Sequence, residues 1–560
     1  MQLRIKALAG LVAGVLLSGS VVAQIDTKLG KEFPLDKRGS VDVSGANKTV
    51  LIAEHKYRTG LRASLDFYRF DKNTLAFEGV FNPIQKNSDI NENDYYTTLS
   101  IKGKVFLFYD VYNNKADKYT LYALPLGEDG KSVGSFLKLM ELDAKKSSNK
   151  GNYQIISSKD SSKICVIASP PYEKNTNEKL VVSTFDNNLK NLTTCQVTMG
   201  YKDNKLLPGK FLLANDGDLL MQSIIYVEKK DREKGDPKTY PALFRIKTTD
   251  GSLDEYQIKI PGMNLDDVDY TIDAQNKVLC AGFYGDPTKG KRSDVDGVFY
   301  LRIDKNSKVI EKTSYKPLPD DIIEELIGER KAKKGRGISN DFEINHFIAR
   351  PNGNTMLLGQ KYFVTVTTTY DPKTKRTTTY YHYNYQGPLV INIDKAGEIT
   401  WAKMLPMKQV FTTTGGSSYA PYGISFTSSF YTPPAPPYGG YAVARTGDKV
   451  FLLYNDHKEN RLKKVLTYKA AKRVSGGKSM IPAVAQIDNS GNYTIEQAFD
   501  AKSEKASYVL NTKNIINLQD NVLLCSLQSQ SKFFRTCFNL CTCGIVPLNR
   551  TGRLAKLTFK

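Results

Sequence analysis

The sequence is poor in the residues that most metal sites require. It holds one tryptophan, four histidines and seven cysteines among 560 residues. The histidines, His55, His346, His382 and His457, contain no HxH or HxxxH pair of the kind that binds zinc. His55 and His457 both follow apolar runs, but they stand far apart in the chain, so we expect no shared site. The sequence therefore predicts no metal and no cofactor.

Signatures of nucleophilic and phosphate chemistry are also absent. There is no GxSxG motif and no glycine-rich phosphate loop. The stretch from Ser293 to Gly297 has the look of a calcium loop, but it lacks the third carboxylate and the distal glutamate, so a turn is expected. A carboxylate pair assembled from distant segments would leave no local pattern, which keeps a carbohydrate-cleaving enzyme open.

Long apolar runs are confined to the start of the chain. Arg4 and Lys6 precede an apolar run from Ala7 to Leu17, and a small-residue motif ends at Ala23. This pattern is typical of a secretory signal peptide over residues 1–23, and the run is short for the alternative, a membrane anchor. We expect an exported protein, in the periplasm, at the cell surface or secreted, with no transmembrane segment after removal of the signal.

Negative charge is in deficit, since 79 Lys and Arg oppose 58 Asp and Glu and give a formal net charge of +21. The basic residues are spread along the chain, with the densest cluster from Arg330 to Arg336. A solvated basic face is the simplest interpretation. For an exported protein, an envelope protein or an acidic glycan is a more suitable partner than nucleic acid.

What the chain has in abundance is a repeated strand pattern. Near-continuous apolar runs of strand length recur eight times, as expected for strands buried on both faces. They are TVLIAEH from Thr49, KVFLFYD from Lys104, KICVIAS from Lys163, DLLMQSI from Asp218, KVLCAGF from Lys277, TMLLGQK from Thr355, KVFLLYN from Lys449 and NVLLCSL from Asn521.

Each run is followed by a second strand that ends in a polar turn, as in VINIDKAGEI (390–399) and YLRIDKNSKVI (300–310). Asx side chains and glycine suit such turns, because they tolerate positive φ and accept local amide hydrogen bonds. The turn residues are therefore expected to be structural and not catalytic. They are Asp71, Asp186, Asp304, Asp394, Asp488 and Asn549.

With a further strand upstream of most runs, the repeating unit has four strands, and such units stack radially. In this arrangement the chain resembles the β-propeller superfamily, and more generally exported bacterial propeller-repeat proteins, without a WD or kelch signature. We predict an all-β fold over 24–560, a single propeller of eight four-stranded blades, with seven as the alternative. The last unit lacks an outer strand, so residues 29–37 are expected to supply it and close the ring.

Three insertions interrupt the repeat. Residues 317–337 read as one helix with an apolar stripe and a basic end, and packing on the ring is favoured over docking to a partner. Residues 363–385 read as a projecting hairpin, and 411–441 as a loop rich in Tyr, Pro and Gly. Tyrosine is common in recognition surfaces, which makes these the candidate ligand-binding residues: Tyr380, Tyr381, Tyr383, Tyr385, Tyr419, Tyr422, Tyr431 and Tyr438.

Six of the seven cysteines fall into two groups, and Cys195 lies apart on an expected outer strand. Cys165, Cys280 and Cys525 lie inside apolar runs and should be buried thiols. In an exported protein, the cluster of Cys537, Cys541 and Cys543 favours a local disulfide, with zinc as the alternative.

Two functions remain for a protein with this pattern. The first is a non-catalytic binding or scaffolding module of the cell envelope, acting as a monomeric ring. The alternative is a carbohydrate-active propeller, a glycoside hydrolase or lyase, with a carboxylate cluster at the mouth of its central channel. Two or three converging carboxylates in the folded protein would favour the enzyme.

Overall fold

The structure is a computed structural model. It describes residues 25–35, 39–59, 62–84, 90–232, 238–286, 294–339, 341–373, 376–415, 435–462, 467–476, 479–499, 507–519, 521–530 and 550–559. In these ranges, no helix is both long enough and apolar enough to cross a membrane.

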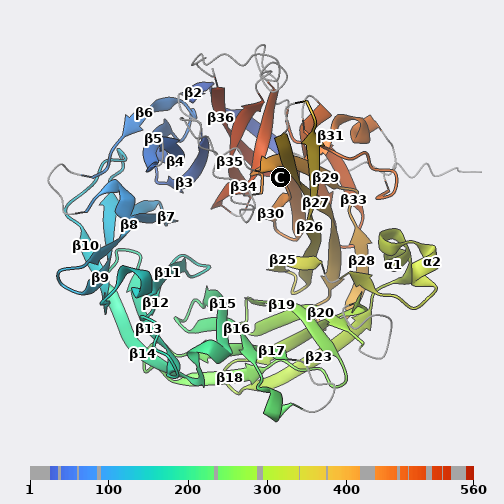
Figure 1. Cartoon of the computed structure of the whole chain (residues 1–560), viewed down its shortest axis with the longest axis horizontal. Coiled ribbons are helices and arrows are strands. Elements are labelled where there is room, and N and C mark those ends of the chain that lie inside the picture. Colours follow the sequence, from blue (N-terminus) through green and yellow to red (C-terminus); the bar gives the residue numbers. More distant parts are fainter. Residues whose placement is uncertain are drawn as a thin grey trace, which may run out of the picture.

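Eight antiparallel sheets of at least four strands surround a common axis in the described part of the chain, so the predicted eight-bladed propeller is confirmed (Figure 1). The chain visits the blades in sequence order, and the blue first blade lies beside the red last blade.

Each blade runs from an innermost strand near the axis to an outermost strand at the rim (Figure 1). The innermost strands are β3 (Gly39–Ala46), β7 (Tyr95–Ile101), β11 (Asn152–Ser157), β15 (Leu206–Leu213), β19 (Asn264–Ile272), β25 (Phe342–Ala349), β30 (Tyr441–Thr446) and β34 (Ser507–Gln519). The second strands are β4 (Val50–Thr59), β8 (Lys104–Asn113), β12 (Lys163–Ser169), β16 (Leu219–Tyr226), β20 (Val278–Gly285), β26 (Thr355–Asp371), β31 (Lys449–His457) and β35 (Val522–Gln530).

The third and fourth strands complete the blades. The third strands are β5 (Arg62–Asp71), β9 (Lys118–Leu126), β13 (Asn177–Asp186), β17 (Thr239–Ile246), β22 (Gly297–Asp304), β27 (Arg376–Ile393), β32 (Met480–Ile487) and β36 (Arg550–Phe559). The outer strands of the first seven blades are β6 (Phe77–Phe81), β10 (Leu137–Asp143), β14 (Asn191–Lys202), β18 (Leu253–Gln257), β23 (Val309–Pro317), β28 (Ile399–Met404) and β33 (Tyr493–Gln497).

The eight apolar runs of the sequence are the second strands, and their burial explains their composition. Successive side chains of a strand point to opposite faces. On β4, Leu51 and Ala53 pack in the cluster shared with the last blade, whereas Val50 and Ile52 pack in the cluster shared with the second blade. Apolar clusters of this kind lie between all eight pairs of neighbouring blades, so the core is a ring of interfaces.

The two ends of the chain close the ring. The last blade takes its outer edge from β1 (Ile25–Leu29) and β2 (Phe33–Leu35), which both pair antiparallel with β36. The predicted closure is therefore confirmed, although it uses two short strands and starts at Ile25. Phe33 and Leu35 are buried in the cluster between the last and first blades.

The turn aspartates act as the sequence predicts. In Asp394, Oδ1 accepts hydrogen bonds from the amides of Ala396 (2.9 Å) and Glu398 (2.8 Å). Asp186 and Asp488 do the same in their own turns. Asn549 lies outside the described residues.

The predicted helix packs on the ring as expected, but Gly328 divides it. Its φ of 84° ends α1 (Asp320–Ile327) before α2 (Glu329–Ala332) begins. Ile322 of α1 joins the cluster between the fifth and sixth blades. Arg336 forms a bidentate ion pair with Asp294, and this pair ties the insertion to the short sheet of β21 (Asp294–Val295) and β24 (Ile338–Ser339).

The hairpin of residues 363–385 is formed by the far halves of β26 and β27, which stay paired as far as Asp371 and Arg376. The segment read as a loop from residue 411 begins differently, because β29 (Lys408–Gly415) adds a third strand to β27. Backbone pairing needs no apolar side chains, and the Thr-rich end of this strand continues no apolar alternation, so no strand signal was present there.

Candidate functional site at the ring axis

The innermost strands are irregular where they face the axis. Six of them, β3, β7, β15, β19, β25 and β34, carry a register shift of the β-bulge kind. Bulges re-aim side chains and are common beside active sites. At two of the shifts a polar side chain contacts the next blade, since Asp267 accepts from the Ile344 amide and Asn345 accepts from the Tyr441 hydroxyl.

A polar group lies on the inner strands β15, β19 and β25, and we call it the axial cluster. Strands β19 and β25 of neighbouring blades run beside one another at the axis (Figure 1). The axial cluster consists of Lys210, Asp266, Asp267, Asp269, Glu343 and His346.

Two contacts tie the cluster together across blade boundaries. Lys210 Nζ is 2.5 Å from Asp269 Oδ1, and the latter also accepts the amide hydrogen of Tyr270 at 2.8 Å. On the other side, the amide of Ile344 donates to Asp267 Oδ2. Asp269 is thus held by the fourth blade and Asp267 by the sixth.

The pKa values of three carboxyl groups of the cluster, Asp266, Asp267 and Glu343, are raised. Burial raises the pKa of Asp266, and the nearby charge of Asp267 adds to the effect. Asp267 and Glu343 are exposed on their strands, but the surrounding protein displaces part of their hydration and raises both pKa values. Asp267 raises the pKa of Glu343 further by charge repulsion.

Two anomalies coincide in the same two residues. Asp267 has a φ of 35°, in the left-handed region that side chains other than glycine rarely adopt. Oδ2 of its neighbour Asp266 is buried and has no hydrogen-bond partner among the described residues. Strained backbone and unsatisfied buried polar atoms both cost free energy and concentrate at functional sites. Their coincidence marks this end of β19 as a functional candidate.

The remaining wall of the cluster is neutral. Burial lowers the pKa of His346 to about 4, so its imidazole is uncharged at neutral pH. The His346 ring lies 5.6 Å from that of Tyr441, whose hydroxyl donates to Asn345 Oδ1 at 3.1 Å. This arrangement can exchange protons through carboxyl groups and can hydrogen-bond a polyhydroxylated ligand. The described residues contain no group of three or more His, Cys, Asp or Glu arranged to hold a metal ion.

The tyrosines predicted to bind a ligand occupy different environments. Tyr383 and Tyr385 are 1% and 6% exposed and belong to the core between the sixth and seventh blades. Tyr380, Tyr381 and Tyr438 are half-buried. Their assignment as binding residues stays a prediction. Tyr419, Tyr422 and Tyr431 lie outside the described residues.

The cysteines of the second strands are buried as predicted, and burial raises the pKa of Cys165, Cys280 and Cys525. The predicted disulfide cluster of Cys537, Cys541 and Cys543 lies outside the described residues.

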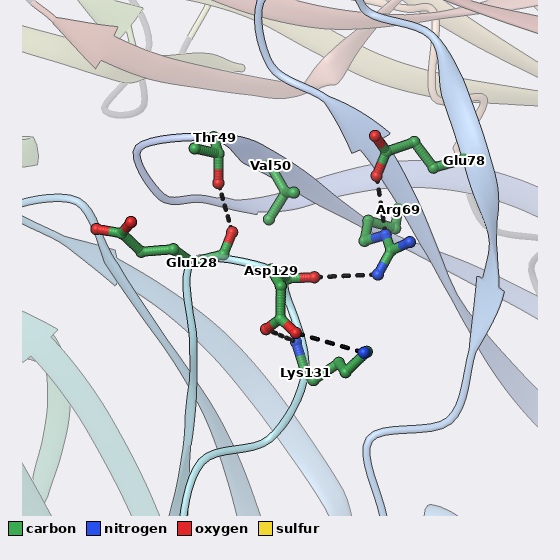
Figure 2. A pocket seen from close by; sticks show the side chains of 7 residues that line it. All are labelled: Thr49, Val50, Arg69, Glu78, Glu128, Asp129 and Lys131. Atoms are coloured by element: carbon green, nitrogen blue, oxygen red, sulfur yellow. Dashed lines mark hydrogen bonds and ion pairs between the residues drawn. The ribbon is translucent and has the colours of Figure 1, made fainter.

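A second polar feature is a pocket of about 470 Å³ on the opposite face, between turns of the first two blades (Figure 2). The charged groups that line the pocket already form ion pairs and hydrogen bonds with one another. Arg69 Nε lies 2.9 Å from Glu78 Oε2, Arg69 Nη1 donates to the carbonyl of Asp129 at 3.0 Å, and Lys131 pairs with the Asp129 carboxylate. The hydroxyl of Thr49 donates to the carbonyl of Glu128. These bonds fasten one blade to the next, which identifies the pocket as a structural contact.

Sequence reasoning missed the axial cluster, although one signal was present. The stretch NLDDVDY (264–270) places three aspartates at the start of an inner strand, where an apolar pattern would otherwise be expected. Charged side chains on a strand that approaches a shared axis lose hydration, so they are costly unless they find partners there. What the sequence could not give was the partner strand, because Ile344 is 77 residues away from Asp267.

Comparison with known proteins gives the chain no family. No family model matches the sequence, and no curated protein is significantly similar to it. Among solved structures, the polysaccharide lyase Uly1 is similar at 13% identity and a TM-score of 0.36, over 95% of this chain and 99% of that chain. The WD40 domain of SCAP from fission yeast is similar at 11% identity and a TM-score of 0.35, over 95% and 98%. An α-L-arabinanase of Penicillium chrysogenum is similar at 10% identity and a TM-score of 0.30, over 60% and 94%.

Proposed function

We propose that the protein is a carbohydrate-active propeller that binds a glycan at the axial cluster and cleaves a glycosidic bond there. The observation that carries this proposal is the pair formed by Asp267 and Glu343. They lie on neighbouring inner strands, are both exposed, and have pKa values raised above the usual range. Most glycosidases require two carboxyl groups, of which one retains its proton at working pH.

The surroundings of the two groups suggest their roles. Asp267 accepts a backbone hydrogen bond from Ile344, which favours its ionised form. Glu343 has only burial and the repulsion of Asp267 acting on its pKa, and both favour its protonated form. We therefore assign Glu343 as the general acid and Asp267 as the base or nucleophile.

A second candidate function is a non-catalytic binding module of the cell envelope. It is favoured by the projecting sheet of β26, β27 and β29, which presents Thr367, His382 and Thr412 on one face. His382 hydrogen-bonds both threonines, at 2.8 and 2.9 Å. Such a face can bind an envelope protein or glycan without any chemistry. For either function we propose an exported location, supported by the signal-peptide pattern of residues 1–23.

The experiment compares the mature chain with Asp267→Asn and Glu343→Gln on a panel of neutral, amino and uronic-acid oligosaccharides. Calorimetry measures binding, and release of reducing ends or of unsaturated sugars measures cleavage. Glu128→Gln, at the pocket of the opposite face, is the matched control. We expect cleavage by the parent and the control, and a loss of at least about a hundredfold in both axial variants.

The possible results separate the two candidates. If binding depends on Asp267 and Glu343 but no cleavage is detected, the result would refute the enzyme and support the binding module. A panel on which the axial variants and the parent behave alike would refute the axial cluster as the site.

A further inference from the structure

The far half of β26 exposes a strand edge that the rest of the described protein does not cover. Strand β25 begins at Phe342, opposite Lys361, and beyond that point β26 is paired only on its β27 side. From Thr365 to Asp371 the strand is exposed, with Val366 at 54% and Tyr370 at 62%. Edges of this kind are normally protected by charges, proline or bulges. The run from Tyr362 to Tyr370, YFVTVTTTY, contains neither a charge nor a proline.

The direction of the free backbone groups follows from one hydrogen bond. The amide of Tyr362 donates to the carbonyl of Asp341, at 3.2 Å, on the side where β25 ends. In a regular strand, alternate residues direct their N–H and C=O groups to the same edge. Val364, Val366 and Thr368 therefore present their backbone groups to the open edge.

We propose that this edge pairs with the same edge of a second copy, so that β26 of each protomer forms a continuous antiparallel sheet across a twofold axis at Val366. Pairing Val366 with the partner's Val366 is a hydrogen-bonded pair, because both backbones point to the edge. The same register places Val364 opposite the partner's Thr368 and Tyr362 opposite the partner's Tyr370. β-Branched and aromatic cross-strand pairs of this kind stabilise sheets.

Charge supports the same register. With the axis at Val366, Lys361 of one protomer lies opposite the partner's Asp371, and the contact occurs twice. Lys361 already pairs with Asp341 at 3.2 Å, and an ammonium group has a further hydrogen to donate. A shift by two residues would remove both ion pairs, and in one direction it would place Lys361 opposite the partner's Lys373. The edge is thus complementary to itself in one register, which identifies a second copy, and not an unrelated peptide, as its occupant.

This inference is independent of the proposed chemistry, and it departs from the monomeric ring expected from the sequence. The contact is a short strand pair, so we expect a dimer of micromolar affinity, at the weak end of specific interfaces.

Sedimentation velocity over a wide range of protein concentrations tests the proposal on the mature chain. Val366→Lys places two ammonium groups opposite each other on the axis and should weaken the dimer at least about tenfold. Thr377→Lys adds the same charge at the exposed hairpin tip on β27, away from the edge, and should leave the dimer unchanged. Thermal melting confirms that both variants are folded.

A charge exchange then tests the register. Lys361→Asp and Asp371→Lys should each weaken self-association, since each brings like charges together. An equimolar mixture of the two variants should recover a heterodimer, because both contacts are again complementary. A parent that stays monomeric at all concentrations, a dimer that is insensitive to Val366→Lys, or a mixture that does not recover association would each overturn the proposal.

Discussion

Replacing Phe33 by alanine should open the ring at the seam between its first and last blades. Phe33 is 2% exposed, and its ring packs against those of Phe70, Phe77 and Tyr68 at 4.9, 5.8 and 6.1 Å. The same ring covers the backbone of Gly552, where an added Cβ would lie 2.5 Å from it. One side chain thus joins β2 to the last blade and to the first.

The magnitude follows from this burial. Truncating a fully buried phenylalanine to alanine costs about 3–5 kcal/mol through lost apolar contact and the cavity that remains. Single domains are stable by only about 5–15 kcal/mol, so the loss is a large part of the whole. Pro34→Ala is the matched control, because Pro34 is exposed between two buried residues of the same strand and should change stability by less than about 0.5 kcal/mol.

Two measurements check the prediction. Denaturant unfolding gives the change in the free energy of unfolding. Hydrogen exchange shows where the ring opens: amides of β36, at Leu554 and Ala555, should exchange faster in Phe33→Ala, while those of β16, at Leu220 and Met221 on the far side of the ring, should not (Figure 1). Equal acceleration on both sides, or a variant as stable as the control, would refute the view that β1 and β2 close the ring.

Two further predictions concern buried charges. Lys305→Met should destabilise the protein by about 3 kcal/mol, because the buried ammonium of Lys305 bridges Asp216 and, at 2.6 Å, Asp218. Its loss removes the ion pair of Asp216 and leaves Asp218 with Arg245 alone. Burial raises the pKa of Asp216, but the hydrogen bonds from Lys305 and Asn276 lower it more, so the folded-state pKa is below the ordinary value. The stabilisation from the ion pair is therefore lost as the pH falls through this lowered pKa. Urea titrations should show the stabilities of the parent and the variant converging in acid. Asp456 is fully buried, Oδ1 accepts from the His457 amide at 2.7 Å, and burial raises the pKa to about 6, so the ionised form is destabilising above that pH. The stability of Asp456→Asn relative to the parent should therefore improve by about 3 kcal/mol between about pH 4 and pH 8, and a difference that does not change with pH would contradict the buried charge.

The architecture was predictable because its energetics are local in the sequence. A strand buried between two neighbouring blades needs apolar side chains on both faces, so residues such as Leu51 and Ile52 appear side by side. A turn needs an Asx acceptor, as Asp394 shows. The closure was predicted as well, and the pairing of β1 and β2 with β36 confirms it.

The candidate site was not predictable, because its residues are far apart in the sequence. Asp267 and Glu343 belong to different units, and each strand reads as ordinary until the ring brings the two to the same axis. The register shift at Asp267 is a backbone property without a fixed sequence signal. Gly328 is a similar case, because a helix pattern continues through it and only its positive φ shows the break.

The axial cluster lies in a part of the fold where a loss of folding free energy can be tolerated. In the cluster between the fourth and fifth blades most of the buried residues come from the second and third strands, and the inner strand β19 supplies only Val268 and Tyr270. A left-handed aspartate costs about 1–3 kcal/mol, which the neighbouring interfaces offset. Asparagine tolerates the same backbone conformation and keeps an oxygen to accept the Ile344 amide. Asp267→Asn therefore removes the charge and little else. If that variant loses activity while its melting temperature is unchanged, the loss is caused by removal of the carboxylate charge. If its stability falls in parallel, Asp267 is a structural residue.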